Sequence, residues 1–181
     1  MSSAVFFIIQ TLFELYILCF LLRLVLQITR ADFHNPLSQF IVRVTNPVVA
    51  PLRRVVPPVR GLDTATLIVF LVLEGVATWL LARYAGIQLM PGPMILLMLL
   101  RAAYTVVRMY VFAILIYAIL SFVSPGTYNP LSSVLASICE PLLRPVRRII
   151  PPIGGLDLSP LFVIIGLQAL LIALPLPRWL A

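Results

Sequence analysis

The chain has 181 residues, of which 62% are hydrophobic and only 10% are charged. Soluble domains are nearer half apolar and a quarter charged, so this composition excludes an ordinary soluble protein and predicts a membrane protein. The formal net charge is +7, and every basic residue is an arginine. Because these arginines lie beside apolar runs, we expect them to meet anionic lipid and to set the topology, and we expect no nucleic-acid partner.

The first apolar run, residues 4–28, is long enough to cross a membrane as a helix. It contains Glu14 near its middle and Arg23 toward its end. The long stem of Arg23 allows its charge to reach the interface, whereas Glu14 cannot easily do so. Glu14 therefore predicts a polar contact inside the membrane.

A short amphipathic helix is predicted after this run, because Asn35 is followed by proline and then by apolar residues at helical spacing. We expect Pro47 to interrupt this helix and residues 51–58 to form a stiff interfacial turn with prolines at both ends. In this turn, Arg53 and Arg54 would meet lipid phosphates while their apolar neighbours dip into the bilayer. The same arginines can also act as a topology signal, and the two interpretations are compatible.

A second apolar helix is predicted over residues 64–82, with Glu74 inside it. Gly61 permits a tight turn just before this helix, and Asp63 is placed to cap its first amides. The acidic Glu74 resembles Glu14 in lying within an apolar run. We therefore expect it to belong to the same polar cluster inside the membrane.

Residues 84–101 are interpreted as a connector followed by the extension of a third helix. The apolar run over residues 94–123 would form a helix of about 45 Å, which is too long for one upright span. Its first part should therefore lie in the interface or protrude from it. Arg101, Tyr104 and Arg108 fall on one stripe of this helix, which we expect to face protein or water rather than lipid.

The second half of the chain repeats the first at an offset of 94 residues, without a gap. Such an internal repeat predicts two copies of one structural unit. The positions of interest in the second copy are Asn129, Gly155 and Asp157 as cap and turn residues, Pro141 as a helix breaker, Arg144, Arg147 and Arg148 in the basic segment, and Gln168 inside a fourth apolar run over residues 158–176.

Together these elements predict an all-α, four-span transmembrane helical bundle. Two parallel repeats, residues 4–83 and 102–177, would each contain a span, an amphipathic interfacial helix, a Pro/Arg loop and a second span. Because each repeat has an even number of spans, both arginine-rich loops lie on one side. The positive-inside rule places that side in the cytoplasm and both termini outside.

The offset of 94 residues also aligns Glu14 with Arg108. Equivalent positions should lie at the same depth, where opposite charges would stabilise each other in a medium that is costly for a lone charge. We therefore expect Glu14 to pair with Arg108. The same polar cluster inside the membrane would include Arg23, Glu74 and Gln168. Three interpretations stay open for this cluster: a packing clamp that fixes helix register, a polar path for an ion or proton, or a contact with a partner protein.

The second copy contains Asn-Pro-Leu, then Pro-Leu-Leu-Arg-Pro-Val-Arg-Arg-Ile-Ile-Pro-Pro and Gly-Gly-Leu-Asp-Leu-Ser-Pro. This pattern resembles the YggT family, also called YlmG, of small membrane proteins of bacteria and plastids. The first copy departs from it, with Thr64, Ala65 and Thr66 in place of Leu-Ser-Pro. The resemblance implies roles in osmotic-stress tolerance and in cell-envelope or division processes at the bacterial inner membrane. In plastids it implies roles in cytochrome assembly and nucleoid organisation.

Catalysis is not indicated, because the chain has one histidine, no nucleotide-binding glycine pattern and no metal-ligand spacing. We expect no enzymatic activity, no cofactor and no metal site. The leading hypothesis is a membrane scaffold whose basic loops engage anionic lipid and an unidentified membrane protein partner. The alternative is a small ion channel or transporter subunit that contributes to osmotic and ion balance, which would need to form a homo-oligomer to enclose a pore.

Overall fold

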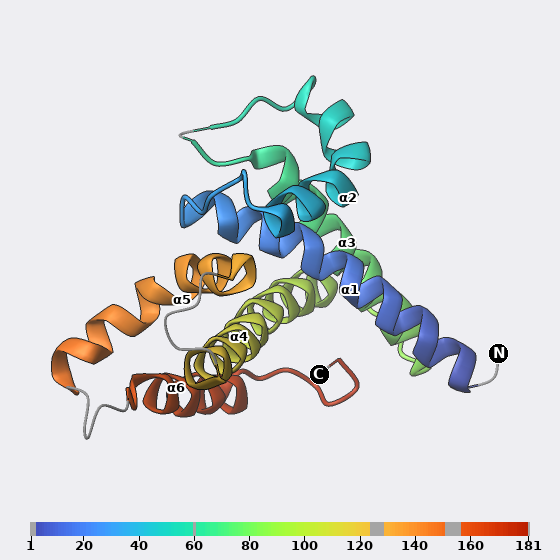
Figure 1. Cartoon of the computed structure of the whole chain (residues 1–181). Helices are drawn as coiled ribbons and strands as arrows, with labels where there is room; N and C mark the ends of the chain where they lie inside the picture. The colour runs from blue at the N-terminus through green and yellow to red at the C-terminus, as the bar shows by residue number, and fades with distance from the viewer. Residues whose placement is uncertain (1–2, 60, 124–128, 151–156, 181) are drawn as a thin grey trace. The chain divides into compact units, whose positions relative to one another are not determined.

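The computed structural model describes residues 3–59, 61–123, 129–150 and 157–180, and the regular elements within these ranges are helices. The helices are α1 (Ser3–Ile28), α2 (Pro36–Arg53), α3 (Thr64–Tyr84), α4 (Pro91–Val123), α5 (Pro130–Ile149) and α6 (Ser159–Ala173), as Figure 1 shows. The predicted all-α class is therefore confirmed for the part of the chain that the structure describes.

Three of these helices, α1, α3 and α4, are long and apolar enough to cross a membrane. At 1.5 Å per residue they are about 32 to 50 Å long, against a hydrocarbon core of about 30 Å. α4 has 33 residues, and Figure 1 shows it as one uninterrupted helix. The extension predicted before the third span is therefore continuous with it.

The prediction of four spans is wrong in its last member, because α6 has only 15 residues. A helix of this length rises about 22 Å, which is short of the hydrocarbon core. Prolines limit it at both ends. Pro160 lies in its first turn, and Leu174 at its C-terminal cap is extended, with ψ 125°, because it precedes Pro175. Three helices, and not four, meet the length requirement within the described ranges.

The prediction that Pro47 and Pro141 interrupt the amphipathic helices is also wrong. α2 continues through Pro47 and Pro51, and α5 continues through Pro141 and Pro145. All four prolines occupy exposed positions, so the missing backbone donors cost the helix one bond each without placing a ring in the core. Both helices bend in Figure 1, as helices with internal prolines do.

The chain divides into two compact units. Unit 1 contains Met1–Leu24, Ile41–Ala103 and Leu176–Ala181, which include most of α1, the end of α2, all of α3 and the start of α4. Unit 2 contains Val25–Phe40 and Tyr104–Pro175, which include the remainder of α1, α2 and α4 together with α5 and α6.

In unit 1, α1 and α3 lie side by side in opposite directions. Phe6, near the start of α1, stacks on Tyr84 at the end of α3, with the ring centroids 3.7 Å apart. At the other end of the pair, Arg23 of α1 lies 3.6 Å from Asp63, which precedes α3. Phe20 is fully buried between these two ends. The two helices thus have a rigid, fixed register.

In unit 2, α5 packs on α6, and buried side chains of α4 and α5 form the core. Ile114, Ile138 and Leu143 have at most 1% of their surface exposed. The starts of α2 and α5 also lie together, because Asn35 Nδ2 donates a hydrogen bond to the carbonyl oxygen of Pro130 at 2.8 Å. Unit 2 therefore brings the beginnings of the two amphipathic helices into contact.

We expect Gly75→Leu to destabilise the protein by about 1–3 kcal/mol, because a larger side chain would overpack the contact between α3 and α4. Met98 Sδ of α4 lies 3.3 Å from the position that a Cβ atom would take at Gly75. Thermal unfolding in detergent would measure the loss. Gly166→Leu in α6 is the matched control, because no atom lies within 4 Å of that position. Equal losses in the two variants would contradict this packing.

Candidate functional site

An arginine near the end of each amphipathic helix is paired with the aspartate that precedes the next helix. Arg53 donates through Nε at 3.1 Å and through Nη2 to the carboxylate of Asp63. Arg147 donates through Nε to Asp157 Oδ2 at 2.7 Å. Both pairs are separated by ten residues and occupy equivalent positions of the two repeats. We call them the first and second clasp.

The first clasp has the more buried aspartate, since 3% of the Asp63 side chain is exposed against 31% for Asp157, whereas its Arg53 side chain is 47% exposed. Asp63 also caps α3 by accepting hydrogen bonds from the amide and hydroxyl of Thr66. Burial alone would favour the neutral acid, but the hydrogen bonds from Arg53 and Thr66 hold the pKa of Asp63 below its usual value. The same pairing raises the pKa of Arg53. Both partners are therefore charged at neutral pH.

Arg23 belongs to the first clasp, although the sequence predicted it to reach the interface alone. Its side chain is buried, and Nη1 donates to Thr45 Oγ1 at 2.6 Å and to Asn46 Oδ1 at 3.0 Å. Its Nε lies 3.6 Å from Asp63 Oδ2. Arg23 therefore connects α1, α2 and the start of α3, and it does not join the cluster of Glu14 and Glu74.

The second clasp shares one arginine between two acids. Arg147 contacts Asp157 and also Glu140, whose Oε1 lies 2.5 Å from Nη1. Burial opposes the charge of Arg147, but hydrogen bonds with Glu140, Asp157 and Tyr117 raise its pKa above the usual value. Burial likewise opposes the charged form of Asp157, but hydrogen bonds from the Ser159 amide and from Arg147 hold its pKa below the usual value. Two acids thus hold Arg147 in place.

The other three arginines of the predicted basic segments are exposed. Arg54 follows α2 directly, whereas Arg144 and Arg148 lie in the last two turns of α5. An aliphatic side chain follows the exposed arginine in both repeats, since Val55 follows Arg54 and Ile149 follows Arg148. Both Val55 and Ile149 have 79% of their surface exposed. Each repeat therefore ends its amphipathic helix with a cation beside an exposed aliphatic group.

A buried polar cluster lies between three helices of unit 1. Arg101 of α4 donates to Glu74 of α3 through Nη1 and to Glu14 of α1 through Nη2, at 3.3 Å in the latter case. Gln10 donates to the same Glu14 oxygen at 3.0 Å. The Glu74 side chain is 0% exposed. One cation thus stabilises two carboxylates at the centre of the apolar helices.

The predicted partner of Glu14 was Arg108, but Glu14 contacts Arg101 within its own unit. Arg108 belongs to unit 2, where its guanidinium carbon lies 6.0 Å from the ring centroid of Phe112. Gln168 is exposed on α6 in unit 2. The pairing of Glu14 with Arg108 stays a prediction, because the two residues lie in different units.

Most of the predicted cap and turn residues take those positions in the structure. The Oδ1 atoms of Asn35 and Asn129 each accept the amide two residues later at 2.9 Å. Gly61 has φ 81°, the left-handed conformation that a tight turn requires. Asp157 accepts from the Ser159 amide at 2.9 Å. Gly155 lies outside the described residues.

Sequence reasoning missed two residues that organise these sites. Arg101 was placed on a polar stripe but not with Glu14, because its position in the α4 extension has no polar counterpart in the first repeat. Glu140 was not singled out, although its spacing of seven residues from Arg147 places both on one helix face. Among the described residues, no group of three metal-ligating side chains was found.

Comparisons with known proteins agree with the duplication. A family model described as CCB3/YggT matches residues 2–84 and again residues 96–177. An uncharacterized protein of Pseudomonas aeruginosa is 42% identical over 172 residues, which cover 93% of this chain and 86% of that protein. A protein encoded in the proC 3′ region of Vibrio alginolyticus is 46% identical over 167 residues, covering 90% and 88% respectively.

The uncharacterized protein YggT of Escherichia coli K12 is 38% identical over 167 residues, which cover 91% of this chain and 85% of that protein. No solved structure matches the chain.

Removing the first clasp should destabilise the protein more than removing the second. Asp63→Asn leaves the buried Arg23 without its carboxylate and removes the partner of the half-exposed Arg53, and we expect a loss of about 3 kcal/mol. Asp157→Asn should cost less, because Arg147 keeps its contact with Glu140. Thermal unfolding in detergent would rank the variants. Asp32→Asn is the control, since that side chain is 58% exposed.

Lowering the pH should destabilise the protein in the same way as these substitutions, because it protonates Asp63 and Asp157. The pKa values of Asp63 and Asp157 in the folded protein lie below the value of about 3.9 expected in an unfolded chain. Their stabilisation is therefore complete above about pH 4 and is lost as the pH falls further. In Asp63→Asn, the loss of stability at low pH should be smaller, because one of the two carboxylates is absent. Equal stability of all three variants at pH 7 would contradict a structural role for the clasps.

Proposed function

Because the chain belongs to the CCB3/YggT family and has three helices able to span a membrane, we propose that it is a non-enzymatic membrane scaffold. The exposed ends of α2 and α5 engage anionic lipid head groups and an unidentified membrane protein partner. Such a scaffold acts at the bacterial inner membrane, where it supports assembly or tolerance of osmotic stress. The surfaces involved include Arg54, Arg144 and Arg148, while Arg53 and Arg147 hold the helix ends in place.

The observation that carries this proposal is the repeated juxtaposition of an exposed arginine with a side chain that is 79% exposed and aliphatic. Transferring Val55 or Ile149 from water into lipid is favourable by about 1.5–3 kcal/mol. Each nearby arginine adds about 1 kcal/mol at an anionic surface. A soluble surface would gain nothing from this arrangement, whereas a membrane interface stabilises both groups at once.

The orientation follows from the arginines. The positive-inside rule places the clasps and the exposed arginines in the cytoplasm and the N-terminus outside.

We expect anionic phospholipid to be enriched among the lipids that remain bound to the protein after mild detergent extraction from bacterial membranes. The triple variant Arg54→Gln, Arg144→Gln and Arg148→Gln should reduce this enrichment, because the phosphate-binding cations are lost. Mass spectrometry of the bound lipids would measure the ratio of phosphatidylglycerol and cardiolipin to phosphatidylethanolamine. Arg53 and Arg147 stay unchanged in this variant so that both clasps persist.

The matched control is Arg83→Gln with Arg178→Gln, two exposed arginines outside the amphipathic helices. This double variant should keep the enrichment of the wild-type protein. A wild-type protein without enrichment, or an equal reduction in the control, would refute the lipid-binding role.

The alternative function is a small oligomeric ion channel or transporter subunit, and the buried cluster around Arg101 favours it. Two carboxylates and a guanidinium inside apolar helices are costly, and such groups often mark ion or proton paths. The same cluster also suits a structural role. Arg101 connects three helices, and a single packed cluster of this kind fixes the register of α1, α3 and α4.

The scaffold proposal predicts no potassium flux above that of protein-free vesicles when the purified protein is reconstituted in liposomes. Glu14→Gln would be tested alongside, because that side chain is the most accessible carboxylate of the cluster at 35% exposure. Flux in the wild-type protein that Glu14→Gln changes would instead establish the channel. A Phe112→Leu variant outside the cluster controls for non-specific leakage.

A further inference from the structure

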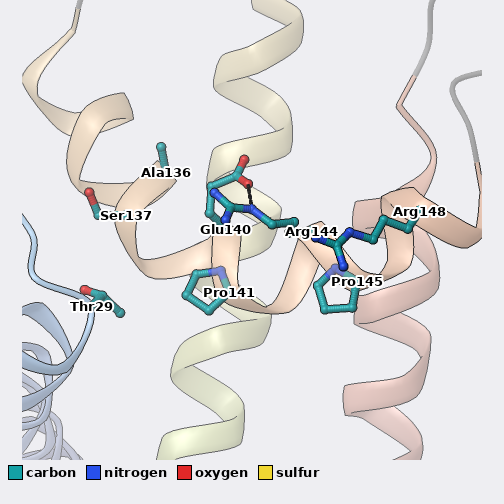
Figure 2. Close-up of a pocket in the computed structure, with 8 residues that line it drawn as sticks. All are labelled: Thr29, Ala136, Ser137, Glu140, Pro141, Arg144, Pro145 and Arg148. Carbon is teal, nitrogen blue, oxygen red and sulfur yellow. Dashed lines mark ion pairs between the residues drawn. The ribbon is translucent and has the colours of Figure 1, made fainter.

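An open cleft of about 630 Å³ lies along α5 in unit 2, beside the end of α1. Figure 2 shows that Arg144 extends toward Glu140 and that the Arg148 guanidinium folds back over Pro145. Thr29, the residue after α1, lines the other side of the cleft. Because α1 is long enough to cross a membrane, this cleft lies where a span ends.

The cleft places two like charges one helical turn apart. Arg144 and Arg148 are both exposed, and cations at this spacing repel each other within a helix. Glu140 compensates only part of this charge, because its Oε1 is 2.5 Å from Arg147 while its Oε2 lies 4.0 Å from Arg144. An anion between the two guanidiniums would relieve the repulsion.

The guanidiniums are the donors that such an anion would use. Ser137 Oγ donates to the Ser133 carbonyl oxygen at 3.1 Å, and Thr29 Oγ1 donates to the Val25 carbonyl oxygen at 2.9 Å. The hydroxyl protons at the cleft are thus committed to the backbone. Arginine forks match the oxygen geometry of a phosphate, which two of them can hold by several charge-assisted hydrogen bonds.

We propose that this cleft is a specific site for the phosphate group of an anionic phospholipid, bound by Arg144 and Arg148. The inference rests on the proposed lipid-binding function and assigns it to one place. The rings of Pro141 and Pro145 line the cleft and provide an apolar contact for the glycerol and upper acyl chain. A free phosphate shares the charge but would gain nothing from these rings.

The repeats differ at this site. Arg148 corresponds to Arg54, but Arg144 corresponds to Ala50, so the first repeat lacks the second guanidinium. Ser137 corresponds to Arg43, which changes the wall of the cleft as well. The chain therefore carries one such site rather than two. Arg54 is exposed at the position equivalent to Arg148, but no second arginine lies one turn before it.

The test measures binding of dioctanoyl phosphatidylglycerol to the purified full chain in neutral detergent by native mass spectrometry. Arg144→Gln with Arg148→Gln should weaken binding about tenfold or more, because two charge-assisted contacts are lost. Arg83→Gln should change it less than twofold, because Arg83 is exposed at the end of α3 and lies outside the basic segments. Arg144→Lys with Arg148→Lys keeps the charge but loses the forks, and it should give an intermediate loss.

Unfolding temperatures would verify that the variants fold, which their exposed positions favour. Wild-type affinity in the double glutamine variant would overturn the site, and a retained preference of that variant for anionic lipid would leave the proposed lipid binding standing. An equal loss in Arg83→Gln would also overturn the site. Displacement of the lipid by millimolar inorganic phosphate would assign the cleft to free phosphate and overturn the lipid. Equal binding of dioctanoyl phosphatidylcholine to the wild-type protein would overturn both the site and the proposed function.

Discussion

Each repeat depends on an arginine–aspartate ion pair that joins the end of its amphipathic helix to the start of the helix that follows. The aspartate caps the first turn of the next helix, and the arginine belongs to the last turn of the previous one. This one interaction therefore satisfies helix amides, neutralises a cation and holds the two helix ends together. The exposed arginine beside each clasp owes its position to this anchor. Surface pairs usually contribute little, but the near-complete burial of Asp63 makes the first clasp an exception.

Both repeats contain this arginine–aspartate pair, but the side chains around it differ in charge between the repeats. Arg23 and Asn46 surround the first clasp, and Tyr117 and Glu140 occupy the equivalent positions near the second. The first clasp thus has an excess of cations and the second an excess of acids. The acidic Glu140 holds Arg147 from a second direction, which leaves Arg144 and Arg148 as the outward-facing charges of α5. After the duplication, the charged residues around the two clasps came to differ. The first repeat now has a closed network of ion pairs, and the second has an open basic cleft.

The sequence predicted what local chemistry determines. The three long helices, the asparagine caps, the turn at Gly61 and the cap at Asp63 all follow from residue type and spacing. The continuity of α2 and α5 through their prolines did not follow, because an exposed proline costs one hydrogen bond that packing of the opposite face can offset. Arg101 could not be matched with Glu14 by repeat symmetry, since its counterpart in the first repeat is the apolar Phe7. Such a choice of partner depends on packing between distant segments.

The prolines of α2 and α5 have a consequence for depth. A proline has no amide hydrogen, so the carbonyl four residues earlier lacks its helical partner. Pro47 and Pro51 in α2, and Pro141 and Pro145 in α5, repeat this deficit along the exposed face of each helix. Hydrocarbon cannot hydrogen-bond those oxygens, and water or head groups can. In the proposed membrane orientation, these carbonyl oxygens would keep the axes of α2 and α5 in the hydrated interface, while the exposed aliphatic side chains at the helix ends enter the bilayer.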